Sequence, residues 1–265
     1  MTSERILTAD GSFTLRHSEL GETYHAREGA QSEAHAKFII PSHLRERLLK
    51  GPVRILDVGF GLGINCREAL NTDGGGPLHI DTVEVEPEVL ERALRLFPDD
   101  PLLLDLRRTR AHARPRRQVH LHLGDLRDLL AELPGPYDLI FHDPFSPLKN
   151  TECWTVDVFI RLKERLKPDG ALLTYSESGV VRASLQQAGF VIGATPALPP
   201  HRGGTIATPD PALPDHPLPP QTHLPYREPF PDATARDIRS AREARVREIK
   251  SAAVPAHPPS PETSA

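Results

Sequence analysis

Short β-rich runs alternate with helical segments over residues 53–192, and this alternation constrains the fold more than any other feature of the chain. Apolar and β-branched runs mark strand candidates at 53–58, 79–85, 118–123, 137–141, 171–175 and 190–193. Helical spacing marks the segments between them, at 64–70, 87–97, 126–133, 156–166 and 179–188. Such alternation is typical of a parallel sheet covered by helices. The sequence therefore predicts an α/β protein with an open, doubly wound, mostly parallel sheet.

Two further regions flank this domain, which we place at 51–207. Residues 1–50 are expected to form an extension, with a hairpin over 5–17 around Asp10-Gly11 and helical spacing over 28–49 that breaks at Pro41. Residues 208–265 are rich in proline, which resists regular packing. There we expect a short helix over 233–249 and a disordered end from about residue 253.

Composition excludes several classes of protein. The chain has 265 residues, of which 38% are hydrophobic and 26% charged, as in soluble globular proteins. No apolar run approaches the roughly 20 residues of a membrane-spanning helix, and the polar start does not resemble a signal peptide. The two cysteines, Cys66 and Cys153, give neither a disulfide framework nor a metal-ligand spacing. We expect a cytoplasmic protein with no metal site and no membrane association, and protein partners remain unassigned.

Charge is concentrated in one segment. The formal net charge of -4 argues against a protein that coats nucleic acid indiscriminately, yet residues 107–117 hold six arginines in eleven positions. Such a run is usually a solvated surface segment. It can also neutralise phosphates and release counterions. Composition leaves both interpretations open.

A glycine-rich loop follows the first predicted strand of the main domain. Gly59, Gly61 and Gly63 let the backbone turn sharply and approach a ligand beside the start of a helix. A nicotinamide fingerprint would require glycine at position 64, which is Ile64. Asp57 before the turn would repel a pyrophosphate but suits the cationic end of S-adenosylmethionine. The motif resembles motif I of the class I, Rossmann-like methyltransferases, and that resemblance implies their cofactor.

Further acids follow the next two strands. Glu84 ends the second strand, where a carboxylate can accept hydrogen bonds from the ribose hydroxyls of the cofactor, and Glu86 competes for this role. Gly124 and Asp125 end the third strand, where the aspartate can accept a hydrogen bond from the adenine amine. The alternative is that Asp125 is a solvated loop residue.

The fourth strand runs into Asp143-Pro144-Phe145, which should face the glycine loop across the crevice. This sequence resembles the Asp/Asn-Pro-Pro-aromatic motif of amine-directed methyltransferases. There an acid or amide and a backbone carbonyl orient the amine, and the aromatic ring stacks on the substrate. We interpret Asp143 as the catalytic residue, positioning the amine and receiving its proton. His142 is either a general base or an ordinary loop histidine.

Several segments together resemble the methyltransferase module of the MnmC family. They lie in the same order along about residues 10–207: 21–25 with 29–33, 57–65, 143–155, 173–176, 181–190 and 202–205. That family methylates the 5-aminomethyl group of the wobble uridine of tRNA, often 2-thiolated. The resemblance therefore implies a tRNA partner carrying 5-aminomethyluridine and an S-adenosyl-L-methionine cofactor.

The resemblance also implies roles for individual residues. Tyr24, Glu33 and Asn65 would lie near the cofactor, whereas Lys149 and Trp154 would shape the substrate mouth. Trp154 can instead be a core anchor, and Lys149 a solvated side chain. The arginine segment becomes a candidate for phosphate contact, and its candidate residues are Arg107, Arg108 and Arg110.

Two departures and two alternatives bear on this hypothesis. Many family members carry a fused flavin oxidase, but this sequence shows no second glycine fingerprint, so we expect a stand-alone methyltransferase. Pro144 stands at the second position of the family's Asp-x-Phe-Ser/Ala-Pro loop. The alternatives are an aminopropyltransferase or other small-molecule amine transferase of the same fold, and a non-catalytic binding protein. Against the former, the first loop is not Gly-Gly-Gly-Asp-Gly-like and no second acid adjoins Asp143.

Overall fold

A computed structural model of the chain describes residues 4–210, 217–223 and 225. The expected C-terminal helix over 233–249 and the expected disorder from about residue 253 lie outside the described residues. No helix in the described part of the chain is both long enough and apolar enough to cross a membrane.

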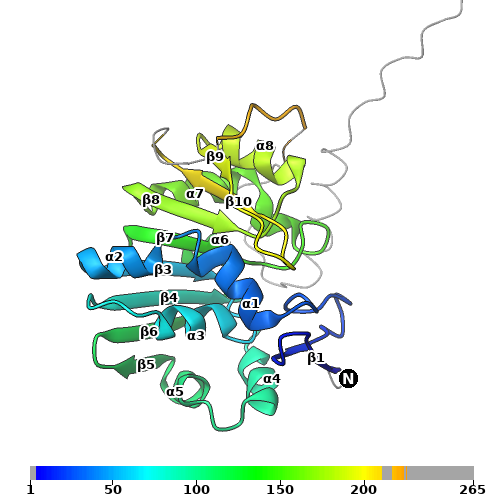
Figure 1. Cartoon of the computed structure of the whole chain (residues 1–265), viewed down its shortest axis with the longest axis vertical. Coiled ribbons are helices and arrows are strands. Elements are labelled where there is room, and N and C mark those ends of the chain that lie inside the picture. Colours follow the sequence, from blue (N-terminus) through cyan, green and yellow to red (C-terminus); the bar gives the residue numbers. More distant parts are fainter. Residues whose placement is uncertain (1–3, 211–216, 224, 226–265) are drawn as a thin grey trace, which may run out of the picture.

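An α/β core occupies most of the described chain (Figure 1). Its strands are β3 (Val53–Val58), β4 (Leu78–Glu84), β5 (Ala111–Arg114), β6 (Arg117–Leu123), β7 (Tyr137–His142), β8 (Leu166–Thr174), β9 (Val191–Ala194) and β10 (Thr205–Thr208). Its helices are α3 (Ile64–Asn71), α4 (Val89–Leu96), α5 (Pro101–Thr109), α6 (Leu126–Leu129), α7 (Val156–Glu164) and α8 (Gly179–Gln187), with a 3-10 turn, η2 (Thr151–Trp154).

Within the described residues these strands form one eight-stranded sheet in the order β5-β6-β4-β3-β7-β8-β10-β9. Strands β6, β4, β3, β7 and β8 are parallel, and β5 and β10 join them antiparallel. The chain leaves β3 toward β4 on one side and returns to β7 on the other. The order thus reverses between β3 and β7, which is where such sheets bind ligands. The predicted doubly wound, mostly parallel sheet is confirmed.

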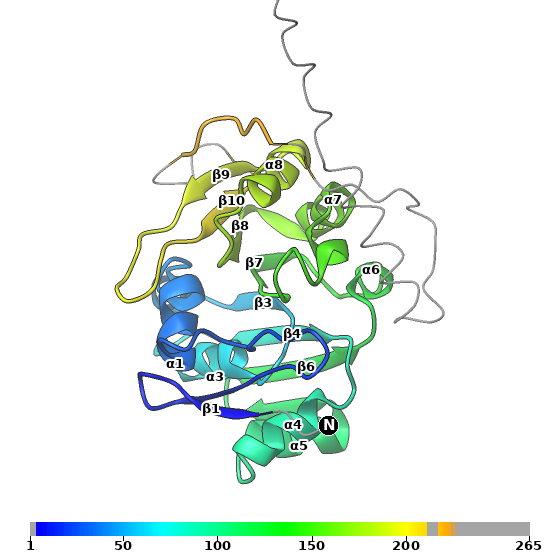
Figure 2. The same ribbon diagram turned by 90° about the vertical axis from the view of Figure 1, so that its right-hand side faces the viewer.

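The two faces of the sheet carry two separate cores because strand side chains alternate. In β3, Val53 and Ile55 point into a cluster with α3, α4 and α5, while Leu56 and Val58 point into a cluster with α6, α7 and α8. Figure 2 shows α1 and α3 on one side of the sheet and α6, α7 and α8 on the other.

The N-terminal extension packs onto the first of these faces. Strands β1 (Arg5–Leu7) and β2 (Phe13–Leu15) pair antiparallel, which confirms the predicted hairpin. Helix α1 (Ala30–Ala34), the π-helical turn η1 (His35–Ile39) and α2 (Leu44–Lys50) follow, and the predicted break falls between η1 and α2. Phe38 and Leu48 are buried in the same cluster as β3.

Four elements were not predicted: α5, β5, β10 and the 3-10 turn η2. Helix α5 begins at Pro101 with Asp100 as its N-cap, a start signal that the sequence does contain. Strand β5 is a half-exposed edge strand without apolar alternation, and β10 has only four residues, so both escape a search for apolar runs. The largest boundary errors concern α6, which ends at Leu129 and not at residue 133, and β8, which begins at Leu166 and not at residue 171.

The arginine segment is not a single loop. It spans the end of α5, the strand β5 and the start of β6. Arg114 and Arg116 donate to the carbonyls of Leu70 and Gly75. Arg117 is buried and donates to carbonyls throughout the turn that precedes β4, namely those of Leu70, Thr72, Gly74 and Gly76. Half of the cluster therefore stabilises this chain's own backbone.

We predict that Arg117→Ala lowers the free energy of unfolding by about 3 kcal/mol, because several buried carbonyls lose a charged donor. The matched control is Arg108→Ala, whose side chain is 77% exposed and, within the described residues, pairs only with Asp105, so its effect should stay below about 0.5 kcal/mol. Urea unfolding measures both. Equal effects of the two substitutions would contradict the division of the cluster.

Candidate active site

A cavity of about 590 Å³ lies at the carboxyl ends of the parallel strands. Its walls come from the glycine loop after β3, the end of β4, the loops after β6 and β7, and residues 16–28 of the extension. Of the predicted site residues, it is lined by Tyr24, Glu33, Gly59, Gly61, Glu84, Gly124, Asp125, Asp143, Pro144 and Phe145. The switch point of the sheet thus coincides with the cavity.

Asp143 joins the two predicted loops. Its N–H donates to the carbonyl of Val58 at 2.9 Å, and its Oδ2 accepts a hydrogen bond from Asn65 Nδ2 at 2.8 Å. A Cβ at Gly59 would lie 2.8 Å from the Asp143 carbonyl oxygen, so only glycine fits there. Asn65 does not line the cavity; it orients the carboxylate that does.

The glycine loop is shaped for a close ligand. Gly59, Gly61 and Gly63 all have positive φ, at 91°, 54° and 76°. Glu84 accepts a hydrogen bond from the N–H of Gly61 at 3.1 Å, which ties the loop to the end of β4. Tyr24 covers the loop, since a Cβ at Gly61 would lie 3.2 Å from its ring. Gly63 caps the start of α3 and lies outside the cavity lining.

Asp57 lies directly behind this loop. Its Oδ2 accepts hydrogen bonds from Thr82 Oγ1 at 2.8 Å and Cys66 Sγ at 3.2 Å. Its Oδ1 is buried and finds no hydrogen-bond partner among the described residues. Burial raises the pKa of Asp57 to about 6. The carboxylate is therefore costly in the free protein and suited to a cationic ligand nearby.

The neighbouring Glu86 is already paired. Its carboxylate binds His17 Nε2 at 2.8 Å and Arg92, and these partners hold its pKa at about 2 despite burial. Arg92 also donates to the hydroxyl of Tyr24. Of the two competing acids, Glu84 is the one that touches the glycine loop.

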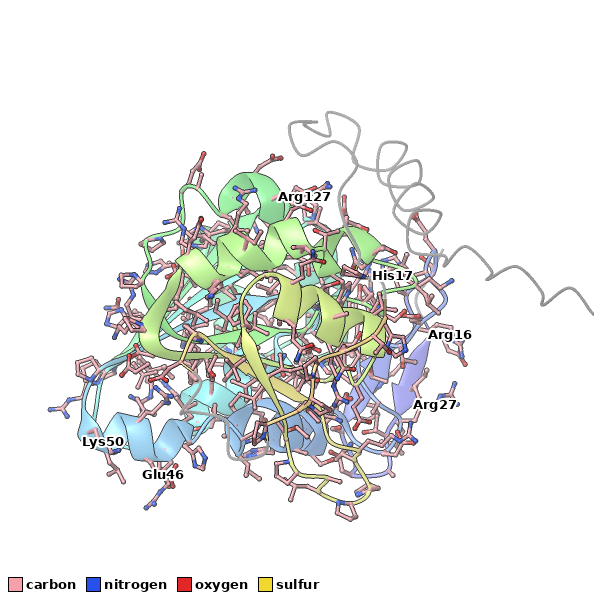
Figure 3. All side chains as sticks on the ribbon, turned by 90° about the horizontal axis from the view of Figure 1, so that it is seen from above. Arg16, His17, Arg27, Glu46, Lys50 and Arg127 are labelled. Carbon is pink, nitrogen blue, oxygen red and sulfur yellow. The ribbon has the colours of Figure 1, made fainter. Side chains whose placement is uncertain are left out.

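Asp125 caps α6 through the N–H of Arg127 and also binds that guanidinium. Gly124 precedes it with φ of 152°. Arg16, Arg27 and Arg127 all line the cavity, and Figure 3 shows Arg16 and Arg27 far from Lys50 of α2.

The cavity is rich in acids. Burial raises the pKa values of Glu33, Glu84 and Asp143, and the charge of Glu33 adds to the effect on Asp143. The nearby ammonium of Lys37 donates to the carbonyls of Arg202 and Gly203. S-adenosylmethionine carries a sulfonium and an ammonium, so the residues present fit this cofactor. The described residues include no cluster of acids, histidines or cysteines that could hold a metal ion.

The loop after β7, which we expect to contact the methyl acceptor, is fixed by side chains that donate to its carbonyls. Tyr175 lines the cavity and donates its hydroxyl to the carbonyl of Pro144 at 3.1 Å, a role that the sequence did not reveal. Trp154 is fully buried, outside the cavity, and donates to the carbonyl of Phe145 at 3.0 Å. His142 packs edge-on against Trp154, and burial lowers its pKa to about 3. It is a neutral core residue with no access to substrate.

The remaining predicted substrate residues do not line the cavity. These are Lys149, Arg107, Arg108 and Arg110. Lys149 lies in the turn before η2, and the three arginines lie at the end of α5. Their contact with a large substrate stays a prediction.

Comparison with known proteins gives independent evidence on the family of this chain. Residues 93–210 match a family model described as S-adenosyl-L-methionine-dependent methyltransferase. The solved structure of MNMC2 from Aquifex aeolicus is 31% identical, with a TM-score of 0.71, over 93% of this chain and 85% of that one. The chain belongs to the MnmC methyltransferase family. Its fold is that of the class I methyltransferases, and the cofactor of this MnmC-family chain is S-adenosyl-L-methionine.

Other relatives are longer than the part of them that aligns with this chain. An uncharacterized protein of Methanocaldococcus jannaschii is 31% identical over 80% of this chain and 61% of its own length. The Azoarcus protein named tRNA 5-methylaminomethyl-2-thiouridine biosynthesis bifunctional protein MnmC is 32% identical over 66% of this chain and 31% of its own length. The chain thus spans less than two thirds of either relative. A spermidine synthase shares the fold alone, at 16% identity over 75% of this chain and 70% of that one, with a TM-score of 0.52.

We predict that Asp57→Asn stabilises the free protein at pH 7.5 by between about 1 and 3 kcal/mol, because it removes a buried charge whose pKa is raised from 3.8 to about 6. A raised acid pKa costs stability as pH rises through it, so the gain should fade as the pH falls from about 6 to 4. Cofactor affinity should fall at least tenfold. Urea unfolding across pH and calorimetric titration of the cofactor measure these effects.

The matched control is Asp138→Asn, because Asp138 binds Lys167 Nζ at 2.7 Å and the N–H of Arg54 at 2.8 Å. Because this carboxylate is paired, Asp138→Asn should lower the free energy of unfolding of the protein. If Asp57→Asn also loses stability at pH 7.5, Asp57 is a structural residue.

Proposed function

We propose that the protein transfers a methyl group from S-adenosyl-L-methionine to the 5-aminomethyl group of the wobble uridine, or its 2-thio form, in tRNA. The product is the 5-methylaminomethyl nucleoside. One observation carries the proposal: Asp143 stands in an acid-rich cavity, directly against the glycine loop that we expect to bind the cofactor. The names of the relatives point to the same tRNA nucleoside.

The residues divide the work between two ends of the cavity. Glu84, Gly124 and Asp125 would hold the ribose and adenine, and Asp57 and Glu33 would offset the positive charges of the cofactor. The cofactor supplies an electrophilic methyl group. Phe145 would lie against the uracil ring, and the mouth beside Arg16 and Arg27 would face phosphates.

Asp143 acts on the amine. An aminomethyl group is largely protonated at neutral pH and cannot attack until it loses a proton. The Asp143 carboxylate attracts the ammonium and accepts that proton, directly or through water, and its raised pKa favours the transfer. Asn65 fixes the orientation of the Asp143 carboxylate. The carboxylate would in turn orient the amine, so that the nitrogen lone pair faces the methyl group of the cofactor. As a protein that acts on tRNA, it would work in the cytoplasm.

The deciding assay incubates the protein with cofactor labelled in the methyl group and two tRNA pools, one with 5-aminomethyluridine and one without. Label should enter only the first pool. Asp143→Ala should lower turnover at least 100-fold and leave cofactor affinity within about threefold, whereas Asp143→Asn, which keeps the contact with Asn65, tests loss of the base alone. Equal labelling of both pools, or preferential labelling of small polyamines, would refute the tRNA substrate.

We further propose that Arg107, Arg108 and Arg110 contact tRNA phosphates. All three side chains are exposed, and the ion pairs of Arg107 and Arg108 lie on the surface. Replacing all three by alanine should weaken tRNA binding and reduce the slope of log affinity against log salt by roughly 2 to 3. The control replaces Arg45 and Lys50, exposed on α2, and should leave the slope unchanged. The same slope in the triple variant and the wild type would show that these three arginines do not contact tRNA phosphates.

A further inference from the structure

The loop after β7 is held by side chains at successive residues. Tyr175 binds the carbonyl of Pro144, Trp154 binds that of Phe145, and Thr151 binds that of Pro147. Trp154 and Thr151 are fully buried. Thr151 and Trp154 belong to η2, and Tyr175 follows β8, so all three contacts come from segments that follow β7 in the chain. They fix the inner side of the loop.

Glu22 holds the remaining residue from the opposite side. Its Oε2 accepts a hydrogen bond from the N–H of Ser146 at 3.1 Å, and its Oε1 accepts one from Ser146 Oγ at 2.5 Å. The two residues are 124 positions apart in the sequence. Both hydrogen bonds are charge-assisted, and together they define one orientation of the loop.

Glu22 is itself fixed by its surroundings. Its carbonyl accepts from the N–H of His17 at 2.8 Å, and Tyr24 donates its N–H to Leu15 at the end of β2 at 3.0 Å. The rings of Tyr24 and His17 pack on Phe145, with centroids 5.0 and 5.3 Å from it. The segment 17–25 therefore contacts the loop after β7 in two ways: the rings of His17 and Tyr24 pack on Phe145, and Glu22 binds Ser146.

We propose that Glu22 is a positioning residue of the active site: it sets the outer side of the loop 144–147 and so the placement of Phe145 beside Asp143. The N-terminal extension is then part of the acceptor site. Glu22 lines the cavity, and its proposed action runs through its two hydrogen bonds to Ser146. Its effect on turnover rests on the function proposed above, whereas its effect on the loop does not.

The loop carries its own reporter, because Trp154 is the only tryptophan in the chain and binds the carbonyl of Phe145. Acrylamide quenching of its fluorescence therefore follows the loop without any substrate. We expect Glu22→Ala to raise the quenching constant at least twofold and to lower kcat roughly tenfold, with the KM for cofactor changed less than twofold. Ser146→Ala should have a smaller effect in the same direction, and the double variant should resemble Glu22→Ala.

Two further variants separate positioning from charge. Glu22→Gln keeps groups that can hydrogen-bond to Ser146, so it should restore kcat to within about threefold of wild type. Glu46→Ala removes an exposed acid from α2, outside the cavity lining, and should behave as wild type in both measurements. Ser146→Ala removes a single hydroxyl and keeps every charge, so it tests the contact even if Glu22→Ala fails to fold.

Three outcomes would overturn the proposal. A Glu22→Gln variant as slow as Glu22→Ala would make Glu22 an electrostatic residue for the amine. Additive effects of Glu22→Ala and Ser146→Ala would show that the two act separately. Unchanged quenching in Glu22→Ala would show that the inner contacts hold the loop alone. If the wild type methylates no aminomethyl tRNA, the proposed function fails, while the quenching result still decides the role of Glu22.

Discussion

The backbone of Asp143 runs against that of Gly59 at the reversal point of the sheet, and the rest of the site depends on this contact. The N–H of Asp143 binds Val58, and a side chain at residue 59 would meet the Asp143 carbonyl at 2.8 Å. Parallel neighbours β3 and β7 thereby place the glycine loop and Asp143, the proposed catalytic acid, at fixed separation. Glu84 then holds the glycine loop from one side, and Asn65 holds the carboxylate from the other.

This geometry concentrates negative charge. Asp57, Glu33, Glu84 and Asp143 share a poorly solvated region, and burial raises all four pKa values. Acids that lack such a role are neutralised locally, as Glu86 is by Arg92 and His17. Burial of these acids costs stability in the free protein, and the cations of the cofactor and of the proposed amine substrate would offset that cost on binding. The same charges would favour ligands with positive centres.

Sequence patterns predicted the parts of the fold whose physics is local. Strands β3, β4, β6 and β7 were each predicted to within about one residue. Strands β3 and β7 are buried on both faces, which favours a mostly apolar run, whereas β6 alternates buried and exposed residues. The glycine loop and the Asp143 loop could also be predicted, because each is a motif of neighbouring residues in the sequence. Long-range pairings left no such signal: nothing near Arg117 shows that it binds the turn before β4. Glu22 likewise has an acceptor-loop partner 124 residues away.

The extension explains how an open sheet becomes a methyl-transfer site. The carboxyl ends of parallel strands face solvent, yet an amine attacks a methyl group efficiently only where water is excluded and both partners are oriented. Residues 16–28 and Glu33 form a wall of the cavity, and within it Tyr24 covers the glycine loop while Glu22 binds the acceptor loop. One short segment therefore touches both ends of the cavity. A segment that precedes the first strand of the sheet thereby turns a crevice into a cavity, because it is fixed to the two loops that must meet.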